Sequence, residues 1–584
     1  MRVENGECRG ARGQGSGARD QAPGASGQAA ERGRQFINHQ SSIINHQSRA
    51  GWWEPLDRAL QWAGDRLNPI LVKETRQALK SRQFTITFAL LLICGWAWSI
   101  LGVALTGPDI WKGAPGADMF FGYYVILAFP LLVIVPFGAF RSLAGEQEDR
   151  TYELMSITTL SPRQIVAGKL GSSVLQMLIY LSAITPCLAF TYMLRGIDFP
   201  TILFFVFYTV LASLALAVVG LLAGTVTSEK HWQVVLSVFL VAGLLAAFLG
   251  SWAFVAEMIN ELRGAFADPE FWQANAAFLT GCLSYLVLLF YAAAAQITFP
   301  SDNRSTRLRA VMLVQHLLLT GWMAWLWLGP VRGEEELLLV FMVFIGLHWY
   351  VMGMFMTGES PQLSPRVKRQ LPQSFLGRVF LTWFNPGPGT GYVLVISSLL
   401  GALAMVLLAI AVKPALGFSR VRPWSPVDTG QILAFGVLGL SYVSIYLGVG
   451  LLLTRLLRLF LRVEVLLTVL LQCLLVLLGL FVPWVVQSLW LRNPDYEHFT
   501  WIRLPDPLCC LLHVFDGRSL PADVSILLVV VPGFALIVFV LNLPAVAREV
   551  QQVRAPKPQR VAEEDAQLAA EKVPPEPART SPWD

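Results

Sequence analysis

Charged residues are scarce in this sequence. They make up 14% of its 584 residues, whereas a soluble domain contains about 25%. Hydrophobic residues reach 55%, above the roughly 45–50% of soluble domains. Too few charges are present to cover the surface of a soluble protein of this length. The composition therefore excludes that class and indicates lipid as the solvent.

Cysteine is also rare, and its pattern excludes a zinc site. None of the seven cysteines has the spacing of zinc ligands, and most stand alone in apolar runs, where a free thiol behaves as a small hydrophobe. Cys509 and Cys510 are sequence neighbours, and a disulfide between neighbours is strained, so none is expected there. We predict no metal site in this chain.

Motifs for catalysis are missing as well. The sequence has no Gly-x-x-x-x-Gly-Lys-Ser/Thr loop, whose backbone amides hold nucleotide phosphates. Gly168-Lys169 lacks the earlier glycine, and Leu170 follows it. An enzyme acting on lipid or polysaccharide would use paired carboxylates or a histidine cluster near the membrane interface, and neither is found. We therefore predict that the chain binds no cofactor and catalyses no reaction.

Long apolar runs, by contrast, are abundant. A helix needs about 20 residues to cross a hydrocarbon core of roughly 30 Å. Helices are expected because runs such as 465–486 are apolar on every face, whereas barrel strands alternate. Twelve runs qualify, at 84–105, 118–140, 170–194, 200–227, 232–256, 273–297, 309–330, 336–357, 391–413, 430–453, 464–489 and 521–545. The predicted fold is all-α: a polytopic integral membrane protein with about twelve transmembrane helices.

Lysine and arginine are divided unevenly between the loops. If the N terminus is cytoplasmic, the inside loops hold the dense basic groups, such as those at 304–309, 366–378 and 455–462, and the outside loops hold fewer, scattered ones. This positive-inside asymmetry predicts a multi-pass protein of the cell (inner or cytoplasmic) membrane with both termini in the cytoplasm. The basic residues lie at helix ends and not on one aromatic and basic face, so nucleic acid is not expected as a partner.

The two ends of the chain differ in composition from the rest. Residues 1–51 are rich in Gly, Arg, Gln and Ala, and the segment 37–41 recurs at 44–48. Residues 546–584 contain six prolines, five glutamates and two lysines. Neither stretch could bury a core, so we expect a disordered N-terminal extension and a disordered cytoplasmic tail.

A basic amphipathic segment, 55–84, precedes the first span. Apolar residues alternate there with arginines and lysines, which is typical of a helix lying in the membrane interface, and also of a basic flank that orients the first span. Asn68-Pro69 predicts a break or a helix start within it.

The loop after the second span is strongly polar and patterned. Glu146, Arg150, Glu153 and Leu154 recur at three- and four-residue spacing, which places opposite charges on one helical face. Ser161-Pro162 then predicts a new helix, because serine is a good N-cap and proline is tolerated in the first turn. A charged loop that only caps two helices would show some of the same features.

These residues resemble a known family. The chain reads Glu146-x-Glu148-x-x-Thr151-x-Glu153-Leu154, and then Leu160-Ser161-Pro162-Arg163-x-Ile165-x-x-Gly168-Lys169, between its second and third spans. This is similar to the permease subunits of type-2 ATP-binding-cassette (ABC-2 type) transporters. The resemblance covers roughly residues 56–300. Arg150 departs from the family, which usually has glycine before the threonine. The resemblance therefore does not define the conformation of the turn at this position.

The resemblance implies a function for this coupling-like segment, residues 146–169. In the family it forms the coupling helix, which docks on a separate cytoplasmic ATPase subunit that carries ATP and Mg²⁺. The ATPase-coupling residues would be Glu146, Glu148, Arg150, Thr151, Glu153 and Leu154, with Arg163, Gly168 and Lys169 shaping the return into the third span. The chain would then be a non-catalytic permease subunit that exports a substrate, surrounded by membrane lipids and paired with a copy of itself or a second permease.

The second half has no clear copy of this segment. We expect a permease domain with six spans at 52–300 and a second six-helix membrane domain at 301–545, which is either a degenerate repeat or an unrelated accessory domain. Ion-coupled transport is the main alternative function. Few ionisable residues lie within the spans, which argues against it: His348 is inside one, and Glu464 sits at a helix start.

Overall fold

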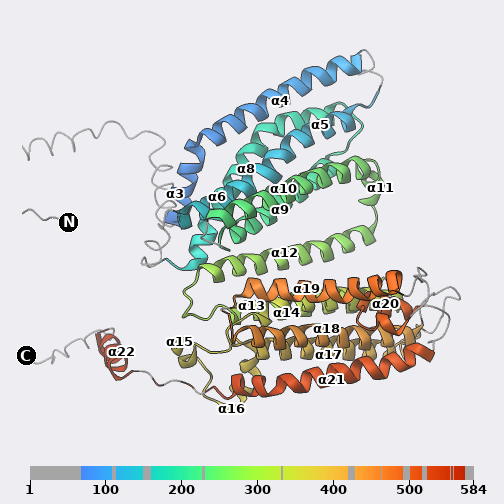
Figure 1. Cartoon of the computed structure of the whole chain (residues 1–584). Coiled ribbons are helices and arrows are strands. Elements are labelled where there is room, and N and C mark those ends of the chain that lie inside the picture. Colours follow the sequence, from blue (N-terminus) through green and yellow to red (C-terminus); the bar gives the residue numbers. More distant parts are fainter. Residues whose placement is uncertain are drawn as a thin grey trace, which may run out of the picture. The chain divides into compact units, whose positions relative to one another are not determined.

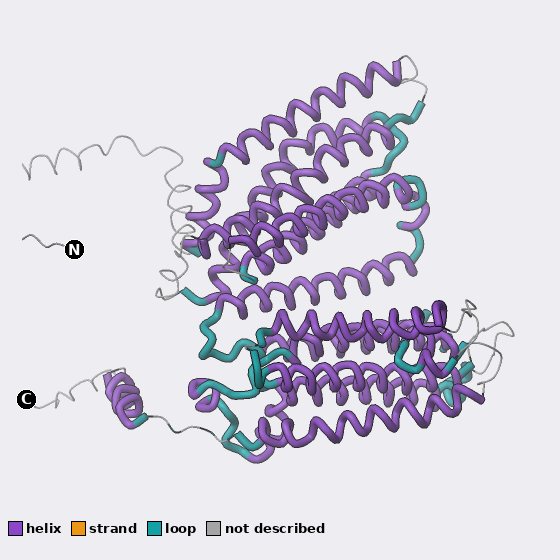
Figure 2. Tube along the Cα trace, viewed as in Figure 1, coloured by secondary structure: helices purple, strands orange, loops and turns teal. Residues whose placement is uncertain are grey.

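The computed structural model describes residues 68–571, with gaps at 108–112, 149–159, 227–229, 331–332, 419–427, 462, 491–499, 516–521, 553, 555 and 557. Every regular element in this part of the chain is a helix (Figures 1 and 2). The N-terminal extension predicted at 1–51 lies outside the described residues.

The first half contains six long apolar helices after a short leading one. In chain order its elements are α3 (Pro69–Lys80), α4 (Arg82–Thr106), α5 (Gly116–Phe129), the π-helical turn η2 (Pro130–Ile134), α6 (Val135–Glu148), α8 (Pro162–Met193), α9 (Phe199–Gly224), α10 (Lys230–Met258), the one-turn α11 (Leu262–Ala265) and α12 (Pro269–Ile297). α5, η2 and α6 run on as a single span, because Pro130, which lacks an N–H, is accommodated by the wider π turn.

The second half contains the remaining long helices and several short ones. Its elements are α13 (Thr306–Leu328), α14 (Glu335–Thr357), α15 (Pro365–Arg369), α16 (Phe375–Leu381), η3 (Thr382–Phe384), α17 (Pro388–Val412), α18 (Thr429–Leu457), α19 (Val465–Val485), η4 (Val486–Trp490), η5 (Trp501–Arg503), α20 (Pro507–His513), α21 (Ala522–Val550) and α22 (Gln559–Glu571). α22 lies in the tail where the composition predicts disorder, and that expectation stays a prediction.

Twelve of these helices are long and apolar enough to cross a membrane, which confirms the predicted all-α polytopic fold. The helix of the third span starts before its apolar run. The run begins at Leu170, whereas α8 begins at Pro162, as Ser161-Pro162 predicts, because Ser161 caps two amphipathic turns that precede the run. A domain boundary near residue 300 stays a prediction.

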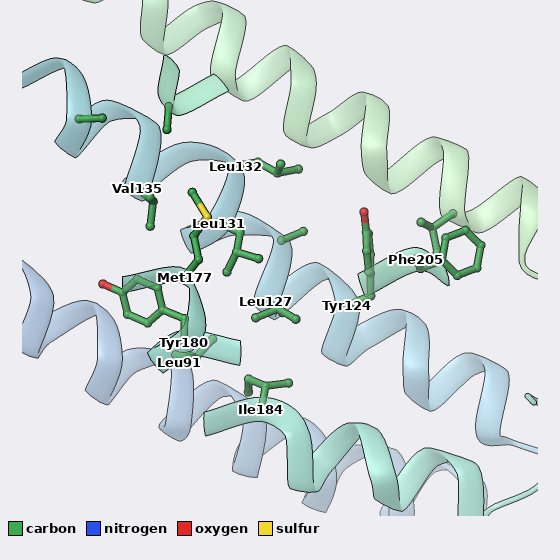
Figure 3. Close-up of a cluster of buried hydrophobic side chains, with 14 of the residues drawn as sticks. Leu91, Tyr124, Leu127, Leu131, Leu132, Val135, Met177, Tyr180, Ile184 and Phe205 are labelled. Atoms are coloured by element: carbon green, nitrogen blue, oxygen red, sulfur yellow. The ribbon is translucent and has the colours of Figure 1, made fainter. Parts of the chain in front are cut away.

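Buried side chains form two large clusters. In the first half, Leu127 and Leu131 meet Met177, Tyr180 and Ile184 of α8 (Figure 3). The cluster of the second half is formed mainly by α13, α14, α17 and α18. Many other large apolar side chains are exposed along the spans, as expected of helices that face lipid. The described cysteines are all free, Cys509 and Cys510 among them.

Candidate coupling site at the start of helix α8

The end of the coupling-like segment is a tightly capped helix start. The Ser161 hydroxyl accepts a hydrogen bond from the Gln164 amide at 3.4 Å, and the Gln164 side-chain oxygen accepts one from the Ser161 amide at 2.8 Å. Pro162 fills the first helical position, where no N–H is needed. This capping box fixes the direction in which the chain enters α8, as the serine and proline predicted.

Helix α3 packs along the first turns of α8. The Asn68 side chain caps α3 by accepting from the Ile70 amide at 3.0 Å, and it also donates to the Gln164 carbonyl at 2.5 Å. Gly168 makes the close contact, because a Cβ there would lie 2.8 Å from the Ile70 Cβ and 3.0 Å from the Leu71 amide nitrogen. The leading helix is therefore held directly on the start of the third span.

A buried lysine joins three helices at this point. The side chain of Lys169 is 1% exposed, and its Nζ lies 3.1 Å from Glu74 Oε1 of α3 and 3.0 Å from Glu146 Oε2 of α6. It also donates to the Ser142 carbonyl at 3.1 Å. We call these four residues the Lys169 cluster. Since a buried charge is costly unless paired and hydrogen-bonded, the cluster holds α3, α6 and α8 in one arrangement.

Lys73 also reaches Glu146, but from the surface. Its Nζ lies 3.7 Å from Glu146 Oε1, and its side chain is 55% exposed. Such a pair contributes little, because water screens it and the long side chain loses freedom when it is held. The buried Lys169 and the exposed Lys73 therefore pair with the same Glu146 carboxylate, but only the buried pair contributes substantially to holding the helices together.

The structure brings together three of the predicted site residues: Glu146, Gly168 and Lys169. Arg163 is exposed on α8, and its guanidinium carbon lies 6.0 Å from the centre of the Tyr291 ring of α12. Glu148 ends α6, but its side chain is not described, and the other predicted contacts, Arg150, Thr151, Glu153 and Leu154, lie outside the described residues. Glu146 was expected to face a partner, whereas here it is mostly buried against Lys169.

Sequence reasoning missed Glu74 and Ser142. Glu74 is the only acidic residue of α3, in a segment otherwise rich in lysine and arginine. That isolation was a usable signal, because one carboxylate among basic residues often has a buried partner elsewhere. Ser142 takes part through its backbone carbonyl, which no side-chain pattern reveals.

A second buried ion cluster lies in the other half. Arg309 is fully buried at the start of α13, and its guanidinium donates to Glu359 Oε2, the Trp383 carbonyl and the Gly387 carbonyl, each at 2.7 Å, and to the Thr390 hydroxyl at 3.0 Å. We call these residues the Arg309 cluster. It fixes the segment between α14 and α17 to the start of α13.

The Arg309 cluster is extended from two neighbouring helices. At the end of α21, the Glu549 carboxylate accepts from the amides of Gly389 and Thr390, both at 2.9 Å, and so caps α17. Arg458, at the end of α18, donates to the carbonyls of Gly358 and Glu359 at 2.8 and 2.7 Å. Burial lowers the pKa of Arg458 from its ordinary value, and the charge of Glu549 opposes that shift.

Four candidate membrane spans, α8, α9, α10 and α12, separate the Lys169 cluster from the Arg309 cluster. Because an even number of crossings returns the chain to the side it left, the two clusters would lie on the same side of a membrane that all four helices cross. In the part of the chain that the structure describes, no group of three or more His, Cys, Asp or Glu side chains is placed to hold a metal ion. No protein-family model, curated protein or solved structure shows a significant match to the chain.

Proposed function

We propose that this chain is the membrane-spanning permease subunit of an ABC-2 type transporter, which exports a substrate when a separate cytoplasmic ATPase acts on residues 146–169. The Lys169 cluster carries the proposal. It ties the two ends of the coupling-like segment, Glu146 on α6 and Lys169 on α8, to each other and to α3. A force applied between these ends would reach the second and third spans and the leading helix together.

The division of labour follows from the sequence. This chain lacks the glycine-rich phosphate loop, so ATP and Mg²⁺ would be held by the partner subunit. The distribution of basic residues between the loops supports a cytoplasmic location, at the inner membrane, for the coupling-like segment and both chain ends. The whole transporter would contain a second permease, which is another copy of this chain, a different subunit, or the chain's own second half.

Co-purification from the native membrane tests the proposal. The affinity-tagged full chain is expected to retain a nucleotide-binding ATPase, and Glu153→Lys, which reverses a charge in the coupling-like segment, should lose it. Glu270→Lys makes the same change in the first turn of α12, three spans away and so on the opposite side, and should retain the ATPase. Recovery of no nucleotide-binding partner with the wild-type chain, together with gradient-driven uptake in vesicles that lack ATP, would instead support an ion-coupled carrier.

A further inference from the structure

A cavity of about 490 Å³ lies among α12, α13, α14 and the segment that follows α14. This volume falls within the roughly 300–1,000 Å³ of sites that bind small molecules. None of the predicted coupling residues that the structure describes lines it. The cavity is therefore a separate site, and what it could hold follows from its lining and its depth.

The lining changes from apolar to charged along the cavity. Toward the interior of the bundle the walls are aliphatic and thioether side chains, including Leu288, Met312 and Met352. At the helix ends, which form the mouth, the lining is charged, and most of these charges are already paired: Arg309 with Glu359, and Asp302 with Arg366, while Arg304 also lines the cavity. An occupant that matches both parts has an apolar chain and a polar head.

The depth of the cavity corresponds to one lipid leaflet. From Leu288 to the end of α12 at Ile297, the helix rises about 14 Å at 1.5 Å per residue. Half of a hydrocarbon core that is roughly 30 Å thick is about 15 Å. A lipid whose head lies at the mouth, level with the helix ends, would therefore have an acyl chain of the right length to fill the apolar part.

A layer of hydrogen bonds lies one turn below the apolar part. Tyr285 of α12 bonds to His348 of α14 at 2.8 Å between the hydroxyl and Nδ1, and Trp349 of α14 donates to His316 of α13 at 3.0 Å. These contacts hold the three helices together at that level. None of these four residues lines the cavity, so the hydrogen-bonded layer lies just beyond its apolar end.

We propose that this pocket binds an acyl chain of a membrane phospholipid, with the head group at the charged mouth. Burial of the chain against the aliphatic walls supplies the binding free energy, since each methylene contributes about 0.8 kcal/mol. This binding does not depend on an ATPase partner.

Photo-crosslinking tests the proposal. The full chain is reconstituted in vesicles that contain phosphatidylcholine with a photoreactive group on its acyl chain, and the labelled peptides are identified by mass spectrometry. Labels are expected on the lining residues of α12 and α14. Ala292→Trp, which fills the pocket, should reduce them about tenfold, the effect of withdrawing about two methylenes from burial. Val287→Trp is the control, because Val287 is 41% exposed on the same helix.

Two outcomes would contradict the proposal. Pocket labelling that survives in Ala292→Trp would overturn it, and so would wild-type labels confined to exposed residues. If Ala292→Trp does not give a monodisperse protein, Ala295→Phe fills another part of the same pocket and takes its place.

Discussion

Replacing Lys169 by methionine should destabilise the junction of α3, α6 and α8. Methionine is apolar and of similar length, so it fills the same space and removes the charge. Glu74 and Glu146 would then remain, largely buried, on either side of a side chain that cannot pair with them. Lys73→Met is the matched control, because Lys73 contacts the same Glu146 carboxylate from the surface.

The expected magnitude follows from burial. Removing one partner of a buried ion pair costs roughly 3–5 kcal/mol, because the other charge is left without compensation. The side chains of Glu74 and Glu146 keep 11% and 13% of their exposure, so the lower limit, about 3 kcal/mol, applies. This is about a hundredfold in the folding equilibrium. The exposed Lys73 pair should contribute less than about 1 kcal/mol.

Reversible unfolding in mixed micelles of detergent and SDS measures both variants. A triple variant, Lys169→Met with Glu74→Gln and Glu146→Gln, should regain most of the lost stability, because no buried charge then lacks a partner. If Lys169→Met and Lys73→Met cost the same, or if the triple variant is less stable than Lys169→Met alone, the Lys169 cluster does not hold these helices as described.

Two further predictions concern packing and the second cluster. Gly168→Ala should destabilise the protein by about 1–3 kcal/mol, because the new methyl group pushes α3 away. Gly145→Ala is the control: nothing lies within 4 Å of the added Cβ, so this variant should be neutral or stabilising. Thermal unfolding of the purified chain compares the two variants. Arg309→Met should cost about 3 kcal/mol, the lower limit again, because Glu359 keeps 17% of its exposure and is left without its cation. The exposed pair of Arg366 with Asp302 serves as the control, since Arg366→Met should cost less than about 1 kcal/mol. Equal losses for Arg309→Met and Arg366→Met would contradict the structural role of the Arg309 cluster.

Most of the fold could be predicted from the sequence because lipid imposes simple rules. A run of about 20 apolar residues has to form a helix in hydrocarbon, so the number of spans follows from the runs. Helix starts could be predicted where a cap was local, as at Asn68-Pro69 and Ser161-Pro162, since the capping groups are sequence neighbours.

The site could be predicted only in part, because ion pairs form between distant segments. Lys169 belongs to the motif, but its partner Glu74 lies 95 residues away, and nothing local connects the two. Arg309 illustrates the same limit. In the sequence, Arg309 is one of several basic residues at a helix end and indicates only the orientation of the chain in the membrane. The structure shows Arg309 fully buried, with partners in the segment between α14 and α17.

The most direct test of the central claim is a crosslink from the coupling-like segment in intact cells. A photoreactive benzoylphenylalanine at Thr151 should join the chain to a polypeptide that contains a nucleotide-binding glycine-rich loop, and the same residue at Glu270 should not. Crosslinking at Thr151 to lipid alone, or to proteins that bind no nucleotide, would contradict the proposal that an ATPase drives this permease through residues 146–169.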